Sequence, residues 1–178
     1  FSTKYGFRAV EKKGNLIYVN GKRVYFKGVN TQDIHPLLGH AIDVKTMLRD
    51  VELMKKANVN TVRTSHYPPD PLLLELADEL GIYIVDENDL ETHGTFAMQL
   101  PPTYNSISND PKWESHYMDR IMRLYQRDKI RGNTSVIMWS LGNEAGGYHN
   151  TDAMYDYLKQ HSPLPVHYES AIHCKRQA

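Results

Sequence analysis

The spacing of apolar and polar residues changes after Asn30. Before that point, Leu16–Val19 and Val24–Phe26 are short stretches typical of strands, and they flank Asn20-Gly21, a pair typical of a type I′ turn. We therefore expect a β-hairpin near the N-terminus, whose second arm continues into Gly28-Val29-Asn30.

Helical periodicity begins at Asp43, which can cap a helix. The apolar positions of that helix are Val44, Met47, Leu48, Val51 and Met54. A second helix, "PLLLELADEL", has Pro71 in its first turn and Gly81 just after its end. Asp110-Pro111 begins a long third helix, and a fourth is expected from about Asp152 to His161. The apolar positions of the third helix are Trp113, Tyr117, Ile121, Leu124 and Tyr125.

Four apolar runs between these helices predict strands: "VNTVRTSHYPP", "IYIVDEN", "SVIMWSLGNE" and "PVHYES". Residues 94–109 are expected to be irregular. Strands that alternate with helices predict a parallel sheet with right-handed crossovers, in either a doubly wound sheet or a (β/α)₈ barrel. No glycine-rich phosphate turn follows the first strand, which disfavours a dinucleotide-binding sheet.

Each predicted strand ends in polar or ionisable residues, although any one of them alone could be a helix cap or a solvated loop residue. In a barrel these ends meet on the face where active sites lie. The residues are Asn30 and Asp33, Ser65 and His66, Asp86 and Glu87, Asn143 and Glu144, and Glu169.

Glu144 is the strongest candidate for chemistry. It follows the buried run Trp139–Asn143 and precedes an open glycine-containing turn. A carboxylic acid between an apolar wall and a ligand is suited to proton donation. The structural alternative is a carboxylate that caps the next helix.

Four further side chains are candidates. Glu91 and His93 form a Glu-x-His pair, and if the segment is extended both side chains point the same way, where they could bind Mg²⁺ or Mn²⁺. On spacing alone, the favoured interpretation of that pair is ordinary polar residues on the surface. His66 could donate a hydrogen bond to a polar substrate, or it could be a histidine whose hydrogen bonds are satisfied within the turn before Pro68. Arg63 lies inside a predicted buried strand and needs a carboxylate partner, for which Asp86, Glu87 and Glu144 are candidates.

Composition excludes several classes of protein. The 178 residues carry 21 basic and 21 acidic side chains, and this balance argues against nucleic acid or an anionic membrane as a partner. No apolar run is long enough to span a membrane. The single Cys174 excludes an internal disulfide and a cysteine-rich zinc site, and it fits a reducing compartment such as the cytoplasm.

The chain resembles the catalytic TIM barrel of glycoside hydrolase family 2, and within it the β-galactosidases. The matching segments are "YFKGVN", "VNTVRTSHYP", "IYIVDENDLETHG", "SVIMWSLGNE" and "PVHYES". "SLGNE" and "SHYP" occur across the family, whereas "ETHG" resembles the galactosidase magnesium site. The resemblance implies a partial barrel of about five of eight β/α units over residues 23–178, preceded by a hairpin from a β-domain over residues 1–22.

The resemblance also implies a role for each matching residue. Glu144 is the general acid/base, Asn143 binds the sugar 2-hydroxyl, and His66 contacts galactosyl hydroxyls. Glu91 and His93, together with Glu144, are the Mg²⁺ ligands. The family's Arg-His-acid-His run is here Thr31–Ile34 followed by His35, so Gln32 and Asp33 are the substrate-binding candidates there, with Gln32 in place of a sugar-contacting histidine.

The family's nucleophile comes from a later strand, so the partner of Glu144 is expected outside this chain, and Glu169 is the candidate within it. The implied activity is hydrolysis of terminal β-galactosides by a retaining mechanism. The expected partners are the remainder of the barrel or further copies of the chain. Two alternatives stay open: another family 2 glycosidase such as a β-glucuronidase, and a non-catalytic sugar-binding or complementation module.

Overall fold

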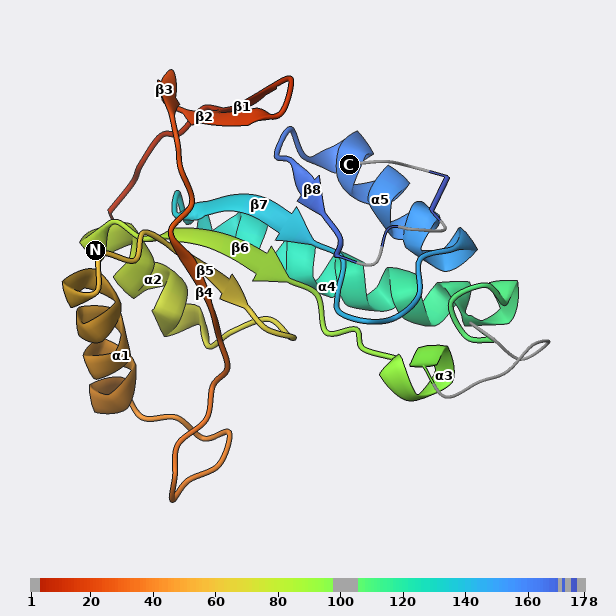
Figure 1. Cartoon of the computed structure of the whole chain (residues 1–178), viewed down its shortest axis with the longest axis horizontal. Coiled ribbons are helices and arrows are strands. Elements are labelled where there is room, and N and C mark those ends of the chain that lie inside the picture. The colour runs from red at the N-terminus through yellow and green to blue at the C-terminus, as the bar shows by residue number, and fades with distance from the viewer. Residues whose placement is uncertain (1–3, 98–105, 170, 172–173, 176–178) are drawn as a thin grey trace.

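The computed structural model describes residues 4–97, 106–169, 171, 174 and 175 (Figure 1). Its main sheet has five parallel strands in the order β4-β5-β6-β7-β8. The strands are β4 (Gly28–Thr31), β5 (Thr61–Thr64), β6 (Tyr83–Glu87), β7 (Val136–Ser140) and β8 (Val166–His167). The connecting helices are α1 (Val44–Lys56), α2 (Pro71–Leu80), α3 (His93–Ala97), α4 (Glu114–Arg131) and α5 (His149–His161).

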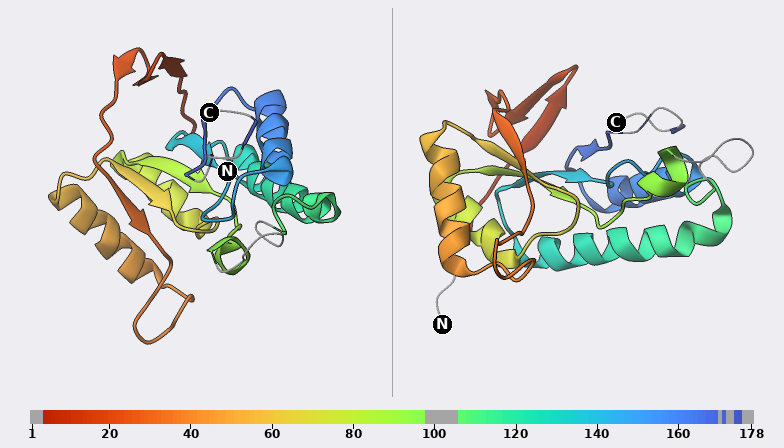
Figure 2. Two further views of the ribbon diagram at one scale, coloured as in Figure 1. Left: turned by 45° about the vertical axis from the view of Figure 1, so that its right-hand side comes forward. Right: turned by 60° about the horizontal axis from the view of Figure 1, so that its bottom comes forward.

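This arrangement is part of a (β/α)₈ barrel. Strand order follows sequence order, and every neighbouring pair is parallel. The helices α1, α2, α4 and α5 run along one side of the sheet in Figures 1 and 2, whereas a doubly wound sheet carries helices on both faces. Of the two architectures that the alternating pattern permits, the structure is the barrel, with five of its eight strands.

The predicted caps begin and end the helices as expected. Asp43 accepts a hydrogen bond from the Thr46 backbone N at 2.8 Å and caps α1. Gly81, with φ of 72°, ends α2 in the left-handed conformation that favours glycine. Asp110 caps a 3₁₀ turn, Pro111–Trp113, that leads into α4.

The core lies between the sheet and its helices, and it contains most of the predicted apolar positions. In α4, Tyr117, Ile121, Leu124 and Tyr125 are buried, but Trp113 is 42 % exposed because it lies in the 3₁₀ turn before the helix. In α1, Met47 and Val51 are buried. Val44 and Leu48 of α1 are exposed, because this helix covers the edge of the sheet and packs on one helix, α2.

The N-terminal hairpin forms a separate antiparallel sheet of β1 (Val10–Lys13), β2 (Leu16–Val19) and β3 (Lys22–Arg23), which stands apart from the parallel sheet in Figure 2. The predicted turn at Asn20-Gly21 is confirmed, with φ of 50° and 74°. The predicted second arm, 24–26, is wrong: the two-residue turn places Lys22 opposite Val19, so pairing begins earlier, and the chain then leaves for β4. β1 was not expected.

Three other boundaries differ from the sequence-based expectation. α3 takes up residues 94–97 of the region 94–109 that was expected to be irregular, and residues 98–105 of that region lie outside the described residues. α5 begins at His149, three residues before Asp152. The last strand pairs over Val166–His167 alone. Among the described residues, no helix is both long enough and apolar enough to cross a membrane.

Asp86 is buried on the helix-covered side of β6, next to α4. Its side chain is inaccessible to solvent, and it interacts with the Asp128 carboxylate of α4. Burial raises the pKa of Asp86 well above its usual value, and the negative charge of Asp128 on α4 raises it further. Asp128 itself is held by two hydrogen bonds of 2.7 Å from Arg127. The Asp86 carboxyl is therefore protonated in the fold over a range of pH in which an unfolded aspartate is ionised.

Asp86 should make stability fall as pH rises. Its contribution is fully present below the pKa of an unfolded aspartate, about 3.9, and is lost as the pH rises through the higher pKa of the folded state. We expect Asp86→Asn to raise the midpoint of thermal unfolding at pH 8 and to flatten its dependence on pH between 4.5 and 8. Asp119→Asn, at an exposed ion pair with Arg123, is the control and should change neither. Equal destabilisation by Asp86→Asn at both ends of that range would contradict this.

Candidate active site

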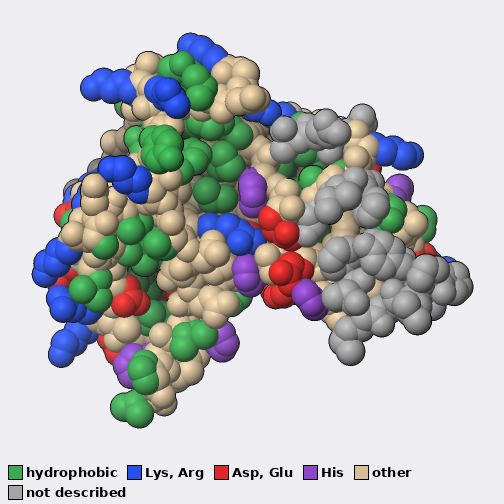
Figure 3. Space-filling model, in the orientation of Figure 1, with side chains coloured by type: hydrophobic (Ala, Val, Ile, Leu, Met, Phe, Trp, Pro, Cys, Tyr) green, Lys and Arg blue, Asp and Glu red, His purple; other side chains and the backbone are tan. Residues whose placement is uncertain are grey.

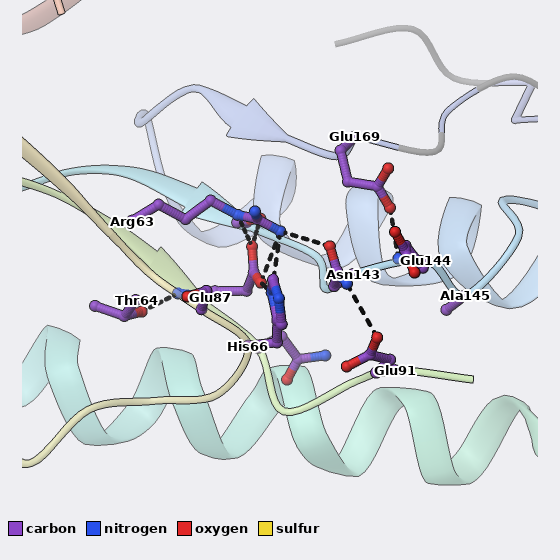
Figure 4. A network of polar contacts seen from close by, with 12 residues as sticks. Arg63, Thr64, His66, Glu87, Glu91, Asn143, Glu144, Ala145 and Glu169 are labelled. Carbon is purple, nitrogen blue, oxygen red and sulfur yellow. Dashed lines mark hydrogen bonds and ion pairs between the residues drawn. The ribbon is translucent and has the colours of Figure 1, made fainter. Parts of the chain in front are cut away.

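Four of the five polar strand ends predicted from the sequence, those of β5, β6, β7 and β8, meet at one end of the parallel sheet. Acidic, histidine and basic side chains gather in the middle of the face seen in Figure 3. The close view in Figure 4 shows that Arg63 and His66 come from the end of β5, Glu87 from β6, Asn143 and Glu144 from the turn after β7, and Glu169 from beyond β8. Parallel strands place their carboxyl ends together, which explains this gathering.

Glu87 is the centre of the network. Its side chain is completely buried, and its backbone N donates to Thr64 Oγ1 at 2.9 Å. Its Oε2 accepts from Arg63 Nε at 2.5 Å and from Ser140 Oγ at 2.6 Å. Its Oε1 accepts from Arg63 Nη2 at 2.9 Å and lies 2.8 Å from His66 Nδ1. These partners satisfy a carboxylate that would otherwise be too costly to bury.

Arg63 has the carboxylate partner that its buried position required, and of the three candidates it is Glu87. Two guanidinium nitrogens donate to that carboxylate, one to each oxygen. This bidentate geometry is the one in which such pairs are strongest. Arg63 Nη2 also donates to Asn143 Oδ1 at 3.0 Å. One arginine thus ties β5 to β6 and to the turn after β7.

Asn143 passes the network on toward Glu91. Its Nδ2 donates to Glu91 Oε1 at 3.1 Å, and its backbone N donates to Leu90 O at 2.8 Å. Gly142 makes this approach possible: its φ is 139°, and a Cβ there would lie 2.6 Å from Leu90 O. The glycine before Asn143 therefore lets the β7 turn lie directly against the segment after β6.

Glu144 has its backbone in the left-handed region, with φ of 38°, which is strained for a residue other than glycine. Two side chains from beyond β8 hold this turn. Glu169 Oε1 accepts from the Glu144 backbone N at 2.5 Å, and Tyr168 OH accepts from the Ala145 backbone N at 3.2 Å. The Glu144 side chain itself is 44 % exposed, so its carboxylate is open to a ligand.

Glu91, His93 and Glu144 each place one possible metal-ligand atom within 4.8 Å of the others. His93 Nδ1 and Glu144 Oε2 are in direct contact. The expectation of an extended Glu91–His93 segment is wrong: Glu91 bridges to Asn143 in a parallel pair, and His93 begins α3. The donors converge because the Glu91–Asn143 bridge aligns the two loops, not because i and i+2 side chains share a face.

The substrate-binding candidates are placed unequally. His66 lies in the network with 23 % of its side chain exposed. Asp33 lies outside it: its Oδ2 accepts from the Asp70 backbone N at 2.9 Å, beside the N-terminus of α2, and its own backbone N donates to Tyr67 OH. Gln32 is exposed, and its backbone carbonyl accepts from Ile34 N. The substrate roles of Asp33 and Gln32 stay predictions.

Sequence reasoning missed Ser140 and His167, which extend the network from Glu87 to β8. Ser140 Oγ lies 3.0 Å from His167 Nδ1, and the parallel pairing of β7 with β8 places these two residues opposite each other. Burial lowers the pKa of His167, and the positive charge of Arg63 lowers it further. The sequence did contain a signal for Ser140. It is a polar residue at an inward-facing position of a buried strand, because side chains two positions apart in a strand point the same way.

Comparison with known proteins gives a consistent result. Residues 10–177 match the family model described as glycosyl hydrolases family 2, TIM barrel domain. A β-galactosidase of Vibrio cholerae is 47 % identical over 169 residues, and one of Pectobacterium atrosepticum is 47 % identical over 165. These alignments cover 94 % and 92 % of this chain but 16 % and 15 % of the relatives, so the chain spans about one sixth of their length.

Solved structures of similar fold include β-glucuronidases. That of Faecalibacterium prausnitzii has a TM-score of 0.77 at 29 % identity, covering 92 % of this chain and 28 % of its own. That of Ruminococcus gnavus in complex with D-glucuronic acid has a TM-score of 0.66 at 31 % identity, covering 89 % of this chain and 24 % of its own.

The Arg63–Glu87 pair should matter more to folding than any exposed ion pair. Arg63→Met leaves a buried carboxylate without its main partner, so we expect a loss of about 3–5 kcal/mol in the free energy of unfolding, measured by urea denaturation. Arg49→Met is the matched control, because Arg49 and Glu52 form an exposed pair at 3.5 Å. Its loss should be below about 1 kcal/mol. Similar losses for the two variants would refute the central role of the buried pair.

Proposed function

This chain belongs to glycosyl hydrolase family 2, and we propose that it carries the acid/base part of the active site of a retaining β-galactosidase. The observation that carries the proposal is the placement of Glu144: an accessible carboxylate at the end of a barrel strand, beside Asn143 and within ligand distance of Glu91 and His93. The substrate class is supported by the relatives named β-galactosidases, at 46–47 % identity.

Glu144 acts first as an acid and then as a base. Its carboxyl proton passes to the glycosidic oxygen as the bond to the anomeric carbon breaks, and a nucleophilic carboxylate forms the galactosyl-enzyme ester. The Glu144 carboxylate then takes a proton from water as the water oxygen attacks the anomeric carbon and releases the nucleophile. The backbone clamps from Tyr168 and Glu169 keep the Glu144 turn in place during both steps.

Asn143 has the capacity to bind a sugar hydroxyl. Its Nδ2 has two hydrogens, and one of them is used by Glu91. Its Oδ1 accepts one hydrogen bond from Arg63 and has a second lone pair. The remaining donor and acceptor are aimed by the bonds already made, so Asn143 can bind the 2-hydroxyl without reorganisation.

Glu91, His93 and Glu144 fit a divalent cation. Two carboxylates and one imidazole with their ligand atoms within 4.8 Å of one another are suited to Mg²⁺ or Mn²⁺ with open positions for water. When bound, the cation would supply positive charge that offsets the repulsion between the two carboxylates. Asn143 fixes the Glu91 carboxylate in advance through its Nδ2.

The nucleophile is assigned to the part of the barrel beyond these five strands. A retaining enzyme needs its two carboxylates about 5–5.5 Å apart. Glu169 was the internal candidate, but its Oε1 binds the backbone N of Glu144, which favours a supporting role. The edge strands β4 and β8 each have one unpaired side in the described sheet, and closure needs three more strands. The expected partner is the rest of the barrel, in a longer polypeptide or in another copy.

A second function within the family is supported by the solved structures named β-glucuronidases, with TM-scores up to 0.77. Their identity to this chain, 29–33 %, is lower than the 46–47 % of the β-galactosidases. A non-catalytic sugar-binding or complementation module is the remaining alternative. Side-by-side turnover of aryl β-galactosides and aryl β-glucuronides by the protein that carries this segment distinguishes all three.

The metal site can be tested without catalysis. We expect Mn²⁺ to bind the chain, as measured by electron paramagnetic resonance or calorimetry. Glu91→Gln should weaken this binding by at least about tenfold. Glu114→Gln is the matched control, because Glu114 and His149 form a comparable exposed Glu–His pair at 2.6 Å. Equal weakening by both substitutions, or binding that neither one affects, would contradict the assignment of Glu91 as a ligand.

Catalysis is tested with an aryl β-galactoside, in Mg²⁺ and then in EDTA. We expect no turnover by the 178-residue chain alone, because the nucleophile is assigned to a later strand, and turnover by the protein that carries this segment with a complete barrel. There, Glu144→Gln should lower kcat by about 10²–10⁴. Turnover by the chain alone that Glu144→Gln abolishes would place the nucleophile within it.

A further inference from the structure

We propose that Glu87 is a positioning residue that holds the proton of the neutral His66 imidazole on Nδ1, so that the ring presents Nε2 to the ligand as a hydrogen-bond acceptor. This proposal rests on the proposed function in one respect, because the identification of the ligand as a sugar comes from that function. The proton assignment itself rests on the contacts of Glu87 alone.

The contacts of Glu87 require it to be ionised. Three donors bind its two oxygens: Arg63 Nε and Ser140 Oγ on Oε2, and Arg63 Nη2 on Oε1. A buried carboxylate that accepts two hydrogen bonds from one arginine is stabilised in its charged form. An ionised carboxylate can only accept hydrogen bonds.

The proton between Glu87 and His66 must therefore belong to the ring. Glu87 Oε1 and His66 Nδ1 are 2.8 Å apart, a hydrogen-bond distance that needs a proton on Nδ1. The competing arrangement has Arg63 Nη2 donate to an unprotonated Nδ1, and that separation is longer, 3.3 Å. Arg63 Nη2 already donates to Glu87 and Asn143, so it does not need His66 as an acceptor.

The consequence appears at the other ring nitrogen. A neutral imidazole with its proton on Nδ1 has a lone pair on Nε2. Among the described residues none is hydrogen-bonded to Nε2, and 23 % of the His66 side chain is exposed at the site. His66 thus accepts a hydrogen bond from a ligand hydroxyl, whereas the sequence-based interpretation made it a donor. Hydroxyl groups of a sugar can serve either role, so the assignment decides how the sugar proton must point.

The test is the tautomer of His66, read from the ¹⁵N chemical shifts of its two ring nitrogens. The protein is labelled with ¹⁵N-histidine, and His66→Gln identifies the signal among nine histidines. Spectra are taken at a pH where further alkalinisation leaves both shifts unchanged, so the ring is neutral. We expect a protonated, pyrrole-type Nδ1 and a pyridine-type Nε2. The opposite pattern in the unsubstituted protein overturns the proposal, whatever the variants do.

Two substitutions assign the effect to Glu87. In Glu87→Gln, the amide oxygen in place of Oε2 keeps the bonds from Arg63 Nε and Ser140 Oγ. The amide N–H in place of Oε1 loses the bond from Arg63 Nη2 and faces His66 Nδ1, so the tautomer should switch to Nε2–H. Ser140→Ala removes a bond to Oε2 but leaves the His66 contact, and it should keep the Nδ1–H tautomer. A tautomer that is unchanged in a folded Glu87→Gln protein would refute the role of Glu87.

Activity separates this proposal from the proposed function. In the protein that carries this segment with a complete barrel, Glu87→Gln should lower kcat/KM for an aryl β-galactoside at least tenfold more than Ser140→Ala does. Absence of galactoside turnover in the unsubstituted protein would remove the proposed function but leave the tautomer result standing. Equal losses in the two variants, despite a tautomer switch in one, would refute a functional role for the Nε2 acceptor.

Discussion

The buried ion pair between Glu87 and Arg63 is the interaction on which the rest of the site depends. A charged carboxylate with no solvent contact is tolerable only if its lone pairs are filled, and here Arg63, His66 and Ser140 fill them. The donors come from three neighbouring strand ends. The contacts that stabilise the buried charge therefore also hold the ends of β5, β6 and β7 together, where chemistry is expected.

From this pair, hydrogen bonds connect buried groups to exposed ones. Arg63 orients the Asn143 amide, Asn143 orients the Glu91 carboxylate, and Glu91 lies with His93 and Glu144 at the solvent-facing edge. Rigid buried groups thus support accessible ones, which is the arrangement that a preorganised site requires. The strained backbone of Glu144 is held separately, from the β8 side, by Glu169 and Tyr168.

The two faces of β6 show why neighbouring carboxylates have different roles. Asp86 and Glu87 are both inaccessible to solvent, but strand alternation sends them to opposite sides. Glu87 meets Arg63 and remains charged, whereas Asp86 meets Asp128 and the core under α4 and is kept neutral. Environment, rather than residue type, decides which of the two carboxylates organises the site.

The sequence by itself determined most elements and the candidate residues for the site. Period, caps and turn residues such as Asp43, Gly81 and Asn20-Gly21 act over a few residues, so they can be read locally. The motifs around His66, Glu91 and Glu144 are local in the same sense. The tertiary structure alone decided that Glu87 is the partner of Arg63, that Ser140 and His167 extend the network, and that Glu169 supports the Glu144 backbone. These contacts join residues 24 to 53 positions apart. Sheet order and strand register determine them, including the register shift in β6 between Ile84 and Val85, and no local pattern specifies either.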